Sequence, residues 1–275
     1  MGDEIRYPPG FCLQEIVSWG SIGMVCLERA SQAVVKSPHE EANENLIAIE
    51  GRIYERFQHY GGHPGLLHYH GPYDESCIRL EYASQGDLHS FVNKGTVSTG
   101  QRLRWAIQIA KALSFIHRVG AIHGDLTCKN IFLDASLNAK VANLSGSSVD
   151  RSPLLVVVTA THAYPKEKPS IKGDLFALGS VLYELITGIV PDSGLSEEAI
   201  ETRYLKGELP DTSSLGAVGS IIRNCWQGKC DDADLVIRNL RVSWLFQAGF
   251  APRSPLGLRG PVFAPGSFIY KKMKL

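Results

Sequence analysis

The stretch His123-Gly124-Asp125-Leu126-Thr127-Cys128-Lys129-Asn130 carries the most information in this chain. It follows the short apolar run Ala121–Ile122 and precedes residues 130–142, whose alternation predicts a β-hairpin. On a tight loop, the Asp125 carboxylate can accept a proton from an attacking hydroxyl while the Asn130 amide oxygen ligates a magnesium ion. The same pair also suits an ordinary polar turn, so the loop alone leaves both interpretations open.

The residues before this loop have the pattern of a small β-rich lobe. Residues 1–83 contain five short runs typical of strands and one helical stretch over residues 40–57. That helix places Ile47, Ile53 and Phe57 on one side. We therefore expect a sheet covered by a single helix.

The rest of the chain is mainly helical until its composition changes. Within residues 84–240, apolar residues recur at helical spacing over 103–117, and residues 175–186 are apolar nearly all round, with Asp174 as the expected N-cap. Residues 241–275 contain no Asp or Glu, six Lys or Arg, four Pro and four Gly. We expect them to form a low-complexity basic tail without ordered structure, and the whole chain to be an α+β protein.

Composition excludes several classes of protein. Apolar residues make up 44% and charged residues 20%, as in soluble globular proteins, and 28 basic residues balance 28 acidic ones. Without a bulk positive field, we expect no nucleic-acid partner. The six cysteines form no CxxC pair, which favours reduced thiols in the cytoplasm or nucleus. The longest aliphatic run, Leu154–Val158, is too short to cross a bilayer, so we expect no membrane partner.

Ordered motifs give the chain a resemblance to the eukaryotic-type protein kinases over residues 14–240. Residues 18–25 resemble the glycine-rich loop, with Ser18 at its first glycine, and residues 81–88 resemble the hinge. Residues 174–188 are similar to the central helix of the large lobe, and Cys225-Trp226 to a late helical motif. The degenerate motifs are similar to those of short kinase-like proteins of filamentous fungi. The resemblance implies a two-lobed fold with a small β-rich N-lobe, 1–83, and a larger helical C-lobe, 84–240.

The resemblance also implies ATP between the lobes and a role for each matching residue. Two glycines would approach phosphate closely, a lysine paired with a helical glutamate would bind phosphate, and apolar residues around a gatekeeper would enclose adenine. The residues implied to bind nucleotide are Gly20, Gly23, Val25, Val34, Lys36, Glu50, Leu80, Glu81, Ala83 and Phe132. The residues implied in catalysis are Asp125 as the base, Asn130 as a metal ligand and Lys129 beside the γ-phosphate.

Several departures from the kinase pattern indicate weakened catalysis. The metal-binding Asp-Phe-Gly motif is replaced by Asn143-Leu144-Ser145, and residues 135–149 contain neither Asp nor Glu. Asn143 would ligate Mg²⁺ (or Mn²⁺) without negative charge, and losing one such electrostatic contact costs about 3–4 kcal/mol of transition-state stabilisation. Gly124 replaces the arginine that reads an activating phosphate. Leu154–Val158 then predicts a buried or paired strand in the activation segment.

Three functions remain open from the sequence. The first is a weak ATP-dependent protein kinase that acts on Ser or Thr hydroxyls of an unidentified protein. The second is a pseudokinase scaffold that binds nucleotide without efficient turnover. The third is an atypical kinase of the KEOPS-complex type or a small-molecule phosphotransferase, because those families share the His-Gly-Asp-Leu run. The oligomeric state stays undetermined.

Overall fold

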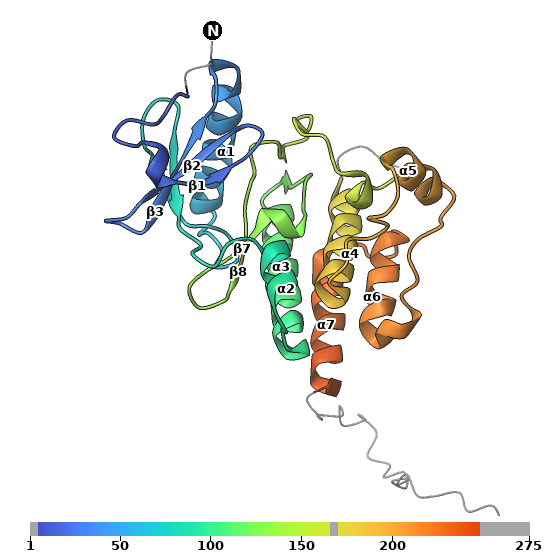
Figure 1. Ribbon diagram of the computed structural model, residues 1–275. Helices are drawn as coiled ribbons and strands as arrows, with labels where there is room; N and C mark the ends of the chain where they lie inside the picture. The colour runs from blue at the N-terminus through green and yellow to red at the C-terminus, as the bar shows by residue number, and fades with distance from the viewer. Residues whose placement is uncertain (1–4, 166–169, 248–275) are drawn as a thin grey trace, which may run out of the picture.

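A computed structural model describes residues 5–165 and 170–247 of the chain. Figure 1 shows two lobes, a sheet with one long helix beside it and a larger bundle of helices. The small lobe contains β1 (Ile16–Trp19), β2 (Gly23–Glu28), β3 (Ala33–Pro38), β4 (Tyr69–Pro72), β5 (Ile78–Glu81) and the helix α1 (Glu44–His59). The strands form one antiparallel sheet in the order β1-β2-β3-β5-β4, which confirms the predicted lobe of five strands and one helix.

The large lobe is built around long helices and also contains short strands. It contains α2 (Leu88–Lys94), α3 (Thr99–Arg118), α4 (Ile171–Thr187), α5 (Glu197–Leu205), α6 (Gly216–Trp226) and α7 (Ala233–Gln247), together with β6 (Ala121–Ile122), β7 (Ile131–Leu133), β8 (Ala139–Val141) and β9 (Ser148–Val149). Two-stranded pairs form between β6 and β9 and between β7 and β8. Short 3₁₀ turns cover Leu13–Glu15, Glu41–Asn43, Cys128–Asn130, Ala160–His162 and Ser213–Leu215.

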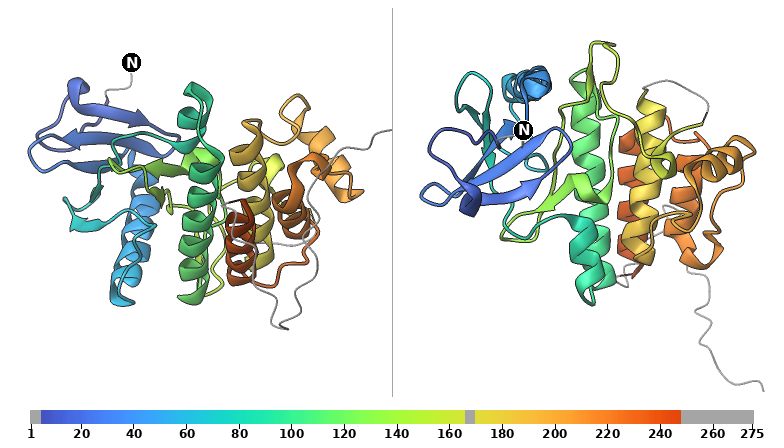
Figure 2. Two further views of the ribbon diagram at one scale, coloured as in Figure 1. Left: turned by 90° about the horizontal axis from the view of Figure 1, so that it is seen from below. Right: turned by 45° about the horizontal axis from the view of Figure 1, so that its top comes forward.

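The core of the large lobe lies between α3, α4, α6 and α7 (Figure 2). Leu178, Val181 and Leu182 of α4 are fully buried, as the all-round apolar pattern predicts. The expected N-cap, however, is wrong: Ser170 caps α4 by accepting a hydrogen bond from the Gly173 N–H at 3.1 Å. Asp174 lies in the first turn of α4, and its side chain accepts hydrogen bonds from the backbone of His123 and Gly124.

Two other segments differ from the sequence-based expectations. The helix α7 continues through Gln247, past the boundary expected at residue 240, and the remainder of the predicted tail, 248–275, lies outside the described residues. Leu154–Val158 forms no strand; Val157 is 94% exposed, while Leu154 and Val156 are half-buried. This run is held by packing of Leu154 and Val156 against Gly124 and Gly146, not by pairing with another strand.

None of the helices in the described ranges combines the length and the apolar character that crossing a bilayer requires.

Candidate active site

The register of the small sheet places four of the predicted nucleotide-binding side chains on one face. Val25 pairs with Lys36 across β2 and β3, and Val34 pairs with Leu80 across β3 and β5. Val34 and Lys36 are two residues apart on one strand, so they project to the same side. Directly paired residues also share a face. The sheet therefore presents an apolar surface with one ammonium group toward the large lobe.

The glycine-rich loop joins β1 to β2 and is held by His39. The Gly20 N–H donates to the Gly23 carbonyl at 2.9 Å, and His39 Nε2 lies 2.7 Å from the Gly20 carbonyl oxygen. The Trp19 ring stacks on His39 with ring centroids 4.2 Å apart. A Cβ at Gly23 would collide with the backbone carbonyl of Ser37. Close packing of β2 against β3 thus accounts for Gly23, a reason that the phosphate-based interpretation missed.

The hinge and the hairpin of the large lobe form the opposite wall. Gln85 donates to the Leu133 carbonyl at 3.0 Å and Leu133 donates to the Gly86 carbonyl at 2.9 Å, which fixes β7 beside the hinge. Ile131 and Leu133 are fully buried and Phe132 between them is half-buried, so Phe132 projects to the other face of the strand. Ala83 lies in the hinge and is buried. The hinge and β7 thus form the wall on which the sequence predicts an adenine site.

The Glu81 side chain turns away from this wall. Its carboxylate accepts a hydrogen bond from the His68 N–H at 2.9 Å and pairs with Lys140 Nζ at 2.9 Å. Along β5 it alternates with Leu80, so the two side chains point to opposite faces. Only the backbone of Glu81 remains available to an adenine ring.

Lys36 and Glu50 form the central ion pair of the site. Lys36 Nζ lies 2.5 Å from Glu50 Oε2, and both side chains are almost completely buried. The other Glu50 oxygen accepts a hydrogen bond from the Leu144 N–H at 3.0 Å. The α1 helix is therefore docked, and a buried charge pair with its remaining lone pairs satisfied connects the two lobes.

A continuous chain of hydrogen bonds runs from this ion pair to the predicted base. Lys36 Nζ donates to Asn143 Oδ1 at 3.0 Å, and Asn143 Nδ2 donates to Asn130 Oδ1 at 3.0 Å. Asn130 Nδ2 then donates to Asp125 Oδ2 at 2.7 Å and to the Asp125 carbonyl at 2.8 Å. Lys36, Glu50, Asp125, Asn130 and Asn143 thus share one cleft, as the sequence predicts.

The loop of residues 123–130 is held in place by Asp174. Its carboxylate accepts hydrogen bonds from the His123 N–H at 2.8 Å and the Gly124 N–H at 2.9 Å, and His117 Nε2 lies 2.8 Å from it. Burial acts to raise the pKa of this carboxyl, but the hydrogen bond and charge of His117, with the backbone donors, outweigh burial and hold the pKa below its usual value. Asp174 therefore stays ionised and fixes the loop backbone.

Asp125 itself is partly buried at the base of the cleft. Burial raises the pKa of its carboxyl, while the nearby His123 and the hydrogen bond from Asn130 act in the opposite direction. A raised pKa makes the carboxylate a better proton acceptor. Lys129 lies on the 3₁₀ turn one residue before Asn130 and is exposed, with no ion pair among the described residues.

The activation segment packs its aliphatic side chains onto the catalytic loop. Gly124 has a left-handed conformation, φ +78°, and a Cβ at this position would collide with the Leu154 side chain. A Cβ at Gly146 would likewise collide with Val156. Leu154 thus occupies the space beside Gly124 into which the expected arginine would extend. Sequence analysis missed this contact, although two glycines facing an aliphatic run were the available signal.

The residues of this site fit a divalent cation poorly in the arrangement described. Both amide oxygens that were expected to ligate it already accept hydrogen bonds, Asn143 Oδ1 from an ammonium group and Asn130 Oδ1 from an amide. Among the described residues no cluster of three His, Cys, Asp or Glu side chains could hold a metal ion. Metal binding would require Asn143 to release Asn130.

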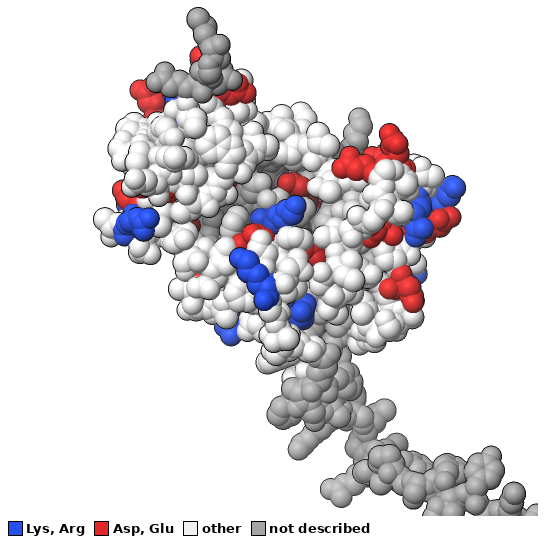
Figure 3. All heavy atoms as spheres, viewed as in Figure 1, with Lys and Arg blue, Asp and Glu red and all other residues white. Residues whose placement is uncertain are grey.

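Figure 3 shows basic and acidic side chains together in the hollow between the lobes.

These features together define a two-lobed fold in which a lysine, a helical glutamate and a loop aspartate are connected between the lobes. The family described as "Protein tyrosine and serine/threonine kinase" matches residues 17–233. The chain belongs to this protein kinase family, whose members generally use ATP and Mg²⁺.

Three of the relatives show the extent of the similarity. The chain is 32% identical to Serine/threonine/tyrosine-protein kinase HT1 of Arabidopsis thaliana over 54% of its own length and 42% of that protein. It is 30% identical to the Megakaryocyte-associated tyrosine-protein kinase of Rattus norvegicus (60% and 37%). It is 27% identical to NUAK family SNF1-like kinase 1 of Mus musculus (77% and 35%). The chain thus spans less than half of each relative's length.

Proposed function

We propose that this protein transfers the γ-phosphoryl group of ATP to Ser or Thr hydroxyls of a protein, and that it does so slowly. The observation that carries the proposal is the unbroken connection from the Lys36–Glu50 pair to Asp125. Lys36, Asp125 and Asn130, to which we assign phosphate binding, proton acceptance and orientation of the acceptor, all belong to this chain of hydrogen bonds.

Each residue has a defined task in the proposed reaction. Lys36 binds the nucleotide phosphates with its ammonium group, and Glu50 keeps that group aimed into the cleft. The Asp125 carboxylate accepts the proton of the attacking hydroxyl, and Asn130 holds the carboxylate in orientation. Mg²⁺ would supply charge neutralisation at the phosphates, and the Asn130 and Asn143 amides would hold it only after the hydrogen bond between them is broken. The loss of one carboxylate is the reason to expect slow turnover.

The proposed preference for Ser or Thr needs a direct test. Relatives named for Ser/Thr activity and for Tyr activity both match this chain, so they do not decide the acceptor. Matched peptides that carry Ser, Thr or Tyr at one position, each with radiolabelled ATP, would measure the preference. Label on the Tyr peptide alone would overturn the proposed acceptor class while leaving phosphotransfer intact.

A second function has a specific observation in its favour. The Asn143 amide donates to Asn130 Oδ1, so the site satisfies its own polar groups without a cation. That arrangement suits a scaffold that binds nucleotide, or only a partner protein, without turnover. No comparable feature favours a small-molecule phosphotransferase.

One pair of measurements separates these functions. The first is phosphotransfer to protein with ATP and either Mg²⁺ or Mn²⁺, with Asp125→Asn as the matched control. The second is a thermal-shift titration with ATP, with and without metal, since a bound nucleotide stabilises the fold by about 2.7 kcal/mol at a hundredfold excess over Kd. Phosphotransfer above the control supports the kinase. Stabilisation by ATP without phosphotransfer supports the nucleotide-binding scaffold. If the protein shows neither phosphotransfer nor stabilisation, both nucleotide-dependent functions are contradicted.

The compartment and partners remain part of the proposal. All six cysteines are free thiols and five of them are buried, which favours the reducing cytoplasm or nucleus. We propose a protein substrate and no nucleic-acid or membrane partner.

A further inference from the structure

An ion pair fastens the C-terminal half of α1 to the large lobe. Arg56 Nη1 and Nη2 each donate to one carboxylate oxygen of Asp150, at 2.6 and 2.8 Å, and Arg56 Nε donates to the Val119 carbonyl at 2.7 Å. Val119 follows the end of α3, and Asp150 follows the end of β9 in the activation segment. One guanidinium group therefore joins α1, the turn after α3 and the activation segment.

The backbone around this ion pair is shaped to hold the carboxylate. Asp150 and Arg151 both have left-handed conformations, with φ +50° and +69°, which residues other than glycine seldom adopt. The Asp150 N–H donates to the Gly120 carbonyl at 3.1 Å, which extends the pairing of β6 with β9. A Cβ at Gly120 would lie only 3.2 Å from Arg56 Nη2 and 3.3 Å from Asp150 Oδ1. The glycine thus leaves room for the ion pair.

Glu50 makes another polar attachment between α1 and the activation segment. Its carboxylate pairs with Lys36 and accepts a hydrogen bond from the Leu144 N–H at 3.0 Å. Arg56 lies six residues further along the same helix. A rigid helix that is held at one point can pivot, whereas a helix held at two points keeps its direction. The Arg56–Asp150 pair therefore determines whether Glu50 stays beside Lys36.

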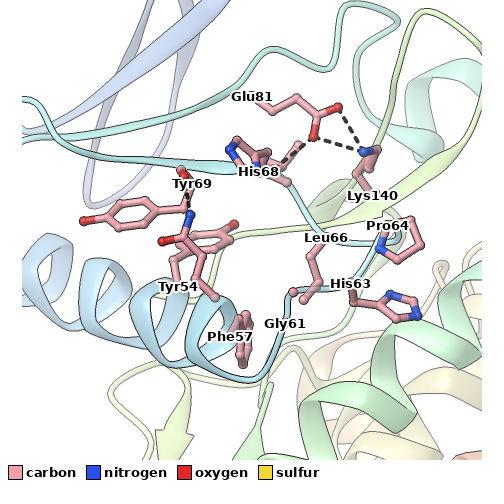
Figure 4. Close-up of a pocket in the computed structure, with 13 residues that line it drawn as sticks. Tyr54, Phe57, Gly61, His63, Pro64, Leu66, His68, Tyr69, Glu81 and Lys140 are labelled. Carbon is pink, nitrogen blue, oxygen red and sulfur yellow. Dashed lines mark hydrogen bonds and ion pairs between the residues drawn. The ribbon is translucent and has the colours of Figure 1, made fainter.

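The apolar contacts of α1 do not fix its direction in the same way. Tyr54 stacks on Tyr69 of β4 with ring centroids 5.8 Å apart, so this contact stays within the small lobe (Figure 4). Phe57 meets Phe115 of α3 edge-on, with centroids 5.6 Å apart. Burial of apolar surface is non-directional, so this pair of rings can slide. A guanidinium fork on both oxygens of a carboxylate has one geometry.

Asp150 gives the activation segment a permanent negative charge. Gly124 stands where the resemblance implies an arginine that reads a phosphate, and residues 123–130 contain no arginine. Carboxylates and phosphates bind a guanidinium group in the same bidentate way. The hydrogen bond and charge of Arg56 hold the pKa of the Asp150 carboxyl below its usual value, so the pair is ionised at neutral pH. Asp150 can therefore attach this segment to α1 without a phosphate.

We propose that Arg56 and Asp150 are positioning residues that keep α1 docked, and hence Glu50 beside Lys36, without phosphorylation of the activation segment. Both act through Glu50. Their effect on the rate of phosphotransfer rests on the proposed function, whereas their effect on the docking of α1 does not. The Asp150 side chain is 69% exposed, and an exposed ion pair adds little to global stability, so the expected effect is local.

The test measures hydrogen exchange at the Leu144 amide by NMR, because this N–H loses its acceptor when Glu50 moves away with α1. The sample is the full chain, treated with a phosphatase and shown by mass spectrometry to carry no phosphate. Arg56→Gln and Asp150→Asn each break the ion pair. Arg52→Gln is the matched control, since Arg52 is exposed on the same helix and makes no ion pair within residues 5–165 and 170–247.

We expect the Leu144 amide of the wild type to be protected, and its protection to fall at least fivefold in Arg56→Gln and in Asp150→Asn but not in Arg52→Gln. The Leu182 amide, in the core of α4, should exchange at the wild-type rate in every variant. Adding Asp150→Asn to Arg56→Gln should cause no further loss. Unchanged protection at Leu144, equal losses at Leu144 and Leu182, or protection in the wild type only after phosphorylation would each overturn the proposal.

Two further measurements distinguish a failure of this inference from a failure of the proposed function. In Arg56→Gln, ATP affinity measured by thermal shift should fall at least threefold, and phosphotransfer at saturating ATP should fall at least tenfold, because Lys36 is no longer aimed. If the wild type neither binds ATP nor transfers phosphate, the proposed function fails, and exchange at Leu144 still decides the docking of α1. Equal phosphotransfer by the wild type and Arg56→Gln would overturn the positioning role.

Discussion

The loop of residues 123–130, here called the catalytic loop, and the segment that covers it, residues 143–158, differ in how far they depart from the kinase pattern. The loop keeps a carboxylate and an amide at the positions where phosphotransfer needs them, and Asp174 holds its backbone. The covering segment has an amide where a carboxylate is expected, and it packs through Leu154 and Val156. Both regions are nevertheless ordered around the same cleft. Neutral hydrogen bonds and aliphatic contacts can therefore preserve the geometry of a charged site after part of its charge is lost.

The largest effect is expected at the ion pair that serves both regions. Lys36→Met would leave the Glu50 carboxylate buried without its partner, so we expect the free energy of unfolding to fall by about 3–5 kcal/mol. Nucleotide binding should be lost as well. Urea denaturation and an ATP thermal-shift titration measure the two effects. The double variant Lys36→Met/Glu50→Leu should recover most of the stability but no binding; undiminished ATP affinity in either variant would contradict the cleft assignment.

Restoring charge to the covering segment tests whether the catalytic loop is otherwise competent. Asn143→Asp should raise the rate of phosphotransfer about a hundredfold in the presence of Mg²⁺, because it returns one electrostatic contact to the metal site. Without metal, the same change should lower stability by about 1 kcal/mol, since a carboxylate cannot donate to Asn130 Oδ1. Adding Asp125→Asn should abolish the gain. A rate that does not rise would favour the scaffold.

Acid should lower the stability of the fold through His162, which is buried in the 3₁₀ turn that follows the covering segment. Burial lowers the pKa of its imidazole to about 4. The unfolded chain therefore takes up a proton below about pH 6.5 while the folded chain does not, and stability falls as pH drops from 6.5 to 4. We expect about 2 kcal/mol to be lost between pH 7 and pH 5 relative to His162→Gln. Urea denaturation at both pH values measures it, and parallel losses in both proteins would refute this origin.

The smallest expected effect is at the contact between the two regions. Gly124→Ala places a Cβ in a left-handed conformation and against Leu154, so we expect it to lower stability by about 1–2 kcal/mol. Leu154→Ala in the same background removes the collision but not the backbone strain. A double-mutant cycle by thermal denaturation separates the two. If the stability changes of the two substitutions simply add, Leu154 makes no destabilising contact with the new Cβ.

Local pattern was sufficient to predict most of the fold. The short β-rich runs of β3 and β5, the helical spacing of α3 and the apolar character of α4 each reflect how a short segment buries its own side chains. Motif order also singled out Lys36, Glu50, Asp125 and Asn130, which belong to one chain of hydrogen bonds in the structure, but it did not indicate where the Glu81 side chain points. Its charge pairs with Lys140, which is 59 residues away along the chain. The periodicity of a single segment cannot predict such a contact.

The amino-acid sequence by itself determined the two lobes, the lysine, glutamate, aspartate and asparagine of the cleft, and the absence of a second carboxylate. These follow from residue identity and from spacing within single elements. Only the tertiary structure decided that Asp174 anchors the loop instead of capping a helix, that Leu154–Val158 covers glycines instead of pairing as a strand, and that the two asparagines bond to each other. Each of these contacts joins residues distant in sequence, and its energy depends on packing that exists only after the lobes have folded.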